Sequence, residues 1–65
     1  MTRLTHSDMA HEMSRALRAC DQWLEDHSAK RPEHEVTVKR RRREALAQAQ
    51  HDYERAAARE RENAA

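Results

Sequence analysis

Residues 9–27, MAHEMSRALRACDQWLEDH, decide the fold of this 65-residue chain. Apolar side chains recur along them at alternating steps of four and three, which places those side chains on one face of a helix. Leu17 and Leu24 lie one residue beyond this line and widen it into a stripe. The pattern predicts an amphipathic helix that packs against other helices. The line itself consists of Met9, Met13, Ala16, Cys20, Trp23 and His27.

Local signals place the ends of two helices. Thr5 is a predicted N-cap, and Asp8 three residues later completes a capping box. Pro32 disfavours helical conformation in the residue before it and suits the first turn of a second helix. We therefore expect one helix over about residues 5–28, a turn over 29–31 and a second helix over 32–62. So short a turn predicts an antiparallel two-helix hairpin, which forms a single all-α domain.

A weaker stripe runs along the second predicted helix and is made mostly of alanine, which lets a neighbouring helix approach closely. We expect Val36 to lie off this stripe, near the turn. The predicted members of the stripe are Val38, Ala45, Leu46, Ala49, Tyr53, Ala56 and Ala57.

The chain is short of core-forming residues. It contains four leucines, two valines and no isoleucine or phenylalanine, and its one cysteine excludes an internal disulfide. Chains of this size need disulfides, metal or oligomerisation for stability. We therefore expect two hairpins to dimerise into a four-helix assembly, with Cys20 as a reduced thiol inside it. The predicted core and dimer residues are Met9, Met13, Leu17, Cys20, Trp23, Leu24 and Leu46.

Five consecutive basic residues, KRRRR at 39–43, form the most distinctive local feature. One interpretation is a solvated helix whose charges pair at helical spacing, as Glu35 with Lys39 and Arg40 with Glu44. The others are contact with an acidic protein surface and contact with nucleic acid. Tyr53 has two interpretations as well, packing against the end of the first helix near Met9 or contact with a partner. The candidate partner-binding residues are Lys39, Arg40, Arg41, Arg43 and Tyr53.

No residue group has the spacing of a catalytic or metal site. The pairs His11–Glu12 and His34–Glu35 resemble the start of a zinc protease motif, but neither has a second histidine at the required position. Asp21, Glu25 and Asp26 are expected on the solvated outer face of the first helix, where no cavity surrounds them. We expect no enzyme and no cofactor. No hydrophobic run is long enough for a signal peptide or membrane span, so we expect a cytoplasmic protein without membrane contact.

The two-helix layout through residues 9–27 and 32–53 has a methionine-bearing seam and an arginine-rich outer surface. In these respects it resembles small phage-encoded host-takeover proteins of the quorum-sensing anti-activator type from Pseudomonas phages. The resemblance implies inhibition of a partner protein in the host cytoplasm, with a host transcription factor or motor ATPase as the target. We therefore expect a homodimeric protein-binding modulator. Nucleic-acid binding through residues 39–43 is the alternative, and the salt dependence of binding would separate the two.

Overall fold

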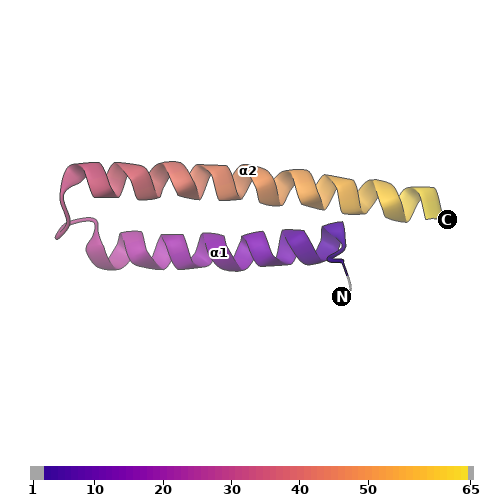
Figure 1. Ribbon diagram of the computed structural model, residues 1–65, viewed down its shortest axis with the longest axis horizontal. Coiled ribbons are helices and arrows are strands. Elements are labelled where there is room, and N and C mark those ends of the chain that lie inside the picture. The colour runs from indigo at the N-terminus through magenta and orange to yellow at the C-terminus, as the bar shows by residue number, and fades with distance from the viewer. Residues whose placement is uncertain (1–2, 65) are drawn as a thin grey trace.

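The computed structural model describes residues 3–64 and contains two α-helices. Helix α1 spans His6–His27 and helix α2 spans Glu33–Ala64. They lie side by side and run in opposite directions, with the turn at one end and the chain termini at the other (Figure 1). The described part of the chain measures 50 × 23 × 15 Å. The predicted all-α fold with two packed helices is confirmed, whereas pairing with a second hairpin stays a prediction.

The start of α1 is fixed by the predicted capping box. Thr5 is extended, with φ −77° and ψ 166°, and its hydroxyl accepts a hydrogen bond of 3.0 Å from the amide of Asp8. The Asp8 carboxylate in turn accepts a bond of 3.2 Å from the amide of Thr5. Two amides that have no partner within the helix are thereby satisfied.

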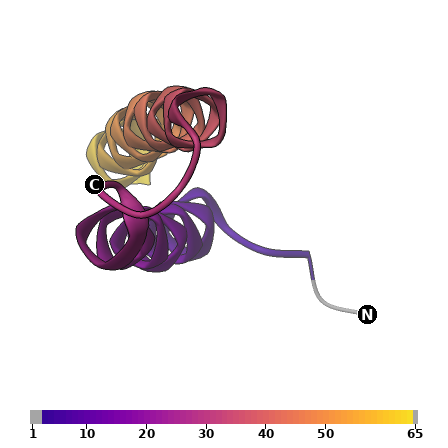
Figure 2. The same ribbon diagram turned by 90° about the vertical axis from the view of Figure 1, so that its left-hand side faces the viewer.

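The reversal between the helices uses few residues. Helix α1 ends at His27, whose carbonyl accepts bonds from the amides of both Lys30 and Arg31, at 2.9 and 3.0 Å. The carbonyl of Pro32 then accepts from the first turn of α2. Seen from the turn, the chain crosses directly from one helix to the other (Figure 2). Helix α2 continues to Ala64, two residues beyond the predicted end.

The core of the hairpin is very small. Only Ala10, Cys20, Val36 and Ala57 are buried among residues 3–64, and no side chain there is fully enclosed. Of the predicted core residues, Cys20 is therefore buried. The remaining six are half-buried: Met9, Met13, Leu17, Trp23, Leu24 and Leu46.

The face of α2 that meets α1 differs from the predicted stripe. Val36 is 5% exposed and Val38 is 59% exposed, so the prediction had these two valines reversed. The stripe was chosen for its apolar content, whereas several positions facing α1 are polar. We call the observed set the inner line; it steps by three and four through Val36, Lys39, Arg43, Leu46, Gln50, Tyr53 and Ala57.

Helix α2 is ten residues longer than α1, 32 against 22. At about 1.5 Å per residue the excess corresponds to roughly 15 Å. The C-terminal end of α2 consequently projects beyond the start of α1 (Figure 1). Neither helix, over the residues described, combines the length and the apolar character that a membrane crossing requires.

Candidate protein interface

The basic run at 39–43 is divided between two faces of α2. Lys39 and Arg43 belong to the inner line and are half-buried, whereas Arg40, Arg41 and Arg42 are exposed. The division follows from helix geometry, because five consecutive residues pass once around the helix. Only part of the run is therefore available to an external partner.

The two inward members of the run contact α1 directly. The Lys39 ammonium lies 5.0 Å from the centre of the Trp23 ring, within cation–π distance. The Arg43 guanidinium donates to both carboxylate oxygens of Asp21, with Nη2 at 3.5 Å from Oδ2. Asp21 was expected on the solvated outer face of α1, and this is corrected: it lies beside the helix contact and pairs across it. The hydrogen bond that Arg43 donates to Asp21, together with the negative charge of Asp21, raises the pKa of Arg43.

The pairs predicted within α2 do not form. Among residues 3–64, neither Glu35–Lys39 nor Arg40–Glu44 comes within ion-pair distance. Lys39 lies over Trp23 instead, and the ion pair that forms within a helix in this part of the chain is Glu12 with Arg15 on α1, at 3.8 Å. The exposed Arg40, Arg41 and Arg42 likewise have no acidic partner within ion-pair distance in residues 3–64.

A shallow hollow of about 310 Å³ lies between α1 and the first turns of α2. It is lined by the half-buried Trp23, the exposed Val38, the cationic Lys39 and Arg42, and also by His34 and the acidic Glu35. An aromatic ring beside an apolar side chain and cations is a combination that protein interfaces favour. We call this feature the Trp23 hollow. The sequence prediction missed it, because Val38 was assigned to the hairpin contact and Arg42 was omitted from the partner-binding set.

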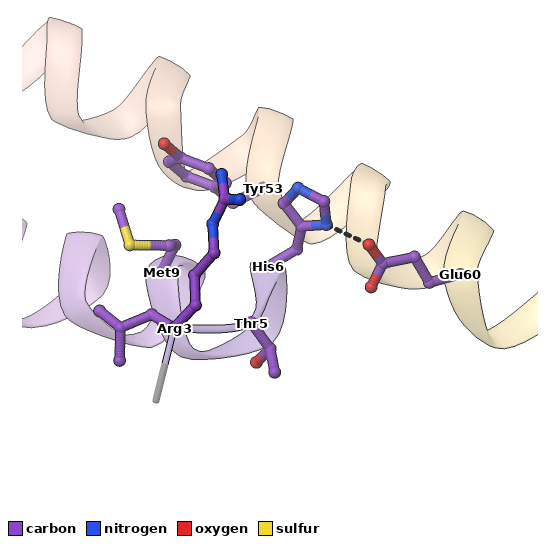
Figure 3. Close-up of a pocket in the computed structure, with 7 residues that line it drawn as sticks. Arg3, Thr5, His6, Met9, Tyr53 and Glu60 are labelled. Carbon is purple, nitrogen blue, oxygen red and sulfur yellow. Dashed lines mark hydrogen bonds and ion pairs between the residues drawn. The ribbon is translucent and has the colours of Figure 1, made fainter. Parts of the chain in front are cut away.

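A wider hollow of about 770 Å³ lies at the opposite end of the hairpin (Figure 3). The His6 ring stacks on Tyr53, with ring centres 6.1 Å apart, and its Nδ1 atom pairs with the Glu60 carboxylate. Met9 lines the same hollow as Tyr53. Tyr53 therefore lies at the end of α1 near Met9, the position given by the packing interpretation of this residue. His6 is exposed, and its contacts with Tyr53 and Glu60 join the two helices here.

These features define what the surface can do. Within residues 3–64, no three His, Cys, Asp or Glu side chains are grouped so that they could hold a metal ion. Arg40 and Arg41, among the predicted partner-binding residues, are exposed and can reach a partner, whereas Lys39, Arg43 and Tyr53 are half-buried in the hairpin. Comparison of the chain with protein-family models, curated proteins and solved structures gives no match.

Proposed function

We propose that this chain is a non-enzymatic, protein-binding modulator that self-associates and inhibits or redirects a second protein by covering an acidic surface on it. The observation that supports this most directly is the free cationic face of α2. Arg40 and Arg41 are exposed and form no ion pair within residues 3–64. Guanidinium groups in this state bind carboxylates through paired hydrogen bonds, which gives both affinity and orientation.

The small core supports the self-association part of the proposal. Four small or medium-sized buried residues cannot by themselves offset the cost of ordering two long helices. Several larger apolar side chains, Trp23 and Leu46 among them, remain half-exposed and would gain burial in an assembly. The proposed mode of action is that of the phage anti-activators the layout resembles, with a host transcription factor or motor ATPase in the cytoplasm as target.

Nucleic-acid binding is the second candidate, and the same arginines favour it. Two of the five basic side chains in the run are engaged by Trp23 and Asp21, which leaves fewer charges to contact phosphates. Affinity for nucleic acid depends on the number of phosphates neutralised. The division of the run therefore favours a protein partner.

The proposal is tested by capture of proteins from a host lysate on the immobilised chain. The test variant is Arg40→Glu with Arg41→Glu, and the matched control is Arg55→Glu with Arg61→Glu, which makes the same charge change at exposed positions elsewhere on α2. We expect one protein to be captured by the wild type and the control and lost from the test variant. Nuclease treatment should leave this capture unchanged.

Two results would contradict the proposal. Equal capture by the test variant would mean that Arg40 and Arg41 form only a solvated face. Binding that is abolished by nuclease, and that weakens by about tenfold or more between roughly 50 and 200 mM salt, would identify nucleic acid as the partner.

A further inference from the structure

Helix α2 carries a second line of side chains beside the inner line. Each member lies one residue before a member of the inner line or of its continuation to position 60. Its members, in steps of three and four, are Glu35, Val38, Arg42, Ala45, Ala49, Asp52, Ala56 and Arg59. We call it the outer line. One residue turns an α-helix by about 100°, so the outer line faces roughly at a right angle to the direction of α1. This is the angle at which a helix in a four-helix bundle meets its second neighbour.

The two central members of the outer line, Ala45 and Ala49, are apolar, and the apolar Val38 and Ala56 lie beyond the charged Arg42 and Asp52 on either side. Val38 is 59% exposed, Ala45 is exposed, and Ala49 and Ala56 are half-buried. Alanine side chains let two helix backbones approach closely. The line also borders the Trp23 hollow, because Val38 and Arg42 form part of its wall. A helix laid along the outer line would thus cover Val38 and close the hollow over Trp23.

The charged members of the outer line alternate in sign: Glu35, Arg42, Asp52 and Arg59. All four are exposed, and none forms an ion pair within residues 3–64. The order is complementary to itself when the line is reversed. In an antiparallel pairing centred on position 47, Glu35 faces the partner's Arg59 and Arg42 faces the partner's Asp52. The two-fold axis repeats both pairs, so that four ion pairs form.

The apolar members match in the same register. Ala45 faces the partner's Ala49, which allows close contact at the centre, and Val38 faces the partner's Ala56. Each match joins residues at equal distances on opposite sides of position 47, which is the relation that a two-fold axis imposes. The charges and the side-chain sizes therefore both favour the antiparallel pairing centred on position 47.

The parallel pairing and the two neighbouring antiparallel registers of two α2 helices bring like charges together. A parallel pairing places Arg42 against the partner's Arg42. An antiparallel pairing shifted by one heptad places either Glu35 against the partner's Asp52, or Arg42 against the partner's Arg59. Like charges facing each other across a helix contact disfavour an arrangement.

The geometry points to a homodimer in which α2 packs antiparallel on α2 of a second copy along the outer line, centred on position 47. This inference rests on the self-association in the proposed function and specifies its surface. It leaves Arg40 on the opposite side of α2 from the contact, whereas Arg41 borders the contact, three residues after Val38 and four before Ala45. Arg40 therefore stays accessible to a second protein while the dimer is formed.

The first test exchanges charges along the outer line and measures mass by light scattering. Arg42→Asp makes positions 42 and 52 both acidic, and Asp52→Arg makes both basic. We expect each variant alone to raise the dimer dissociation constant at least about tenfold, ~1.4 kcal/mol, because each dimer then holds two like-charge contacts. An equimolar mixture of the two variants should recover the dimer. Arg18→Asp, which makes the same charge change at an exposed residue of α1, is the matched control and should dimerise like the wild type.

The second test fixes direction and register by disulfide formation in a Cys20→Ala background. Val38→Cys and Ala56→Cys chains should crosslink when mixed, because these positions face each other. Neither chain should crosslink with itself, since identical positions nine residues from the centre are ~27 Å apart. A disulfide needs Cα atoms within about 7 Å. Circular dichroism of each variant checks that the helices are retained.

The outcomes separate this inference from the proposed function. A wild-type dimer whose charge variants dimerise equally well, or whose Val38→Cys chain crosslinks with itself, would overturn the outer-line pairing and leave self-association standing. A wild-type chain that stays monomeric at tens of micromolar would overturn both. Neither test uses a captured protein, so neither depends on the partner of Arg40 and Arg41.

Discussion

Replacing each of the two valines at the start of α2 by alanine tests the packing of the hairpin. Val36 is 5% exposed and Val38 is 59% exposed, two residues apart on the same helix. The substitutions Val36→Ala and Val38→Ala remove the same atoms from the same secondary structure. Each variant therefore serves as the control for the other.

The expected magnitudes follow from the two exposures. Removing two carbons costs about 1.6 kcal/mol when both are buried, at ~0.8 kcal/mol each. For Val38, with roughly two fifths of its area covered, the same reasoning gives about 0.7 kcal/mol. Alanine stabilises the helix by up to about 0.6 kcal/mol relative to valine at either position, because it is the better helix former. The net loss in free energy of unfolding is then about 1 kcal/mol for Val36→Ala and close to zero for Val38→Ala.

Thermal unfolding followed by circular dichroism at 222 nm measures the difference. For a chain of this size, 1 kcal/mol corresponds to about 4–8 °C in the unfolding midpoint. Val36→Ala should therefore unfold several degrees below Val38→Ala. A loss in Val38→Ala that grows with protein concentration would belong to self-association along the outer line. Equal losses at low concentration, or the reverse order, would refute the burial of Val36 under α1.

Four further predictions concern contacts between the helices. The Cys20 thiol, which is 6% exposed, should react slowly with a thiol reagent in the native protein and rapidly in urea; fast native reaction would mean that α2 does not cover it. Asp21→Asn should lower the urea midpoint less than Val36→Ala does, because Asp21 and Arg43 are both nearly half exposed. High salt should bring the urea midpoint of Asp21→Asn closer to that of the wild type. The pKa of Arg43 is raised, so its contribution to the free energy of unfolding is fully present below its ordinary pKa and is lost only as pH rises through the raised value. The difference in free energy of unfolding between wild type and Arg43→Met should therefore stay constant from about pH 6 to 9. A change in this difference within that pH range would contradict the pairing. Glu60→Gln should speed hydrogen exchange in the last turns of α2 without changing the global midpoint, because it weakens the contact with His6 at the open end of the hairpin.

Helix α1 is the part of the fold that the sequence specifies most clearly. Its start depends on Thr5 and Asp8, which are close in sequence and satisfy each other without help from the rest of the chain. Its stripe contains the largest apolar side chains, so hydrophobic spacing and contact with α2 coincide there. Both signals are local, and both predicted features are present.

Helix α2 could not be oriented from hydrophobicity alone. Its inner line includes Lys39, Arg43 and Gln50, and its outer line includes Val38 and three alanines. The predicted stripe combined members of both lines, because the lines lie only one residue apart. The structure separates them through long-range contacts, Lys39 with Trp23 and Arg43 with Asp21, which spacing within α2 cannot reveal. For the same reason, spacing within α2 could not show that Arg40, Arg41 and Arg42 are the exposed members of the basic run.

The placement of polar residues on the inner line bears on why the hairpin would pair with another copy. Lys39 and Arg43 cover apolar surface with their stems and keep their charged ends at the edge, so they contribute less hydrophobic burial than leucines would. The outer line faces roughly at a right angle to α1 and includes the exposed Val38 and three alanines. Because α1 does not cover the outer line, the apolar side chains of this line can gain further burial only from a second molecule. The alternating charges within this line complement themselves in the antiparallel register centred on position 47, so a second copy of α2 is the neighbour that they fit best.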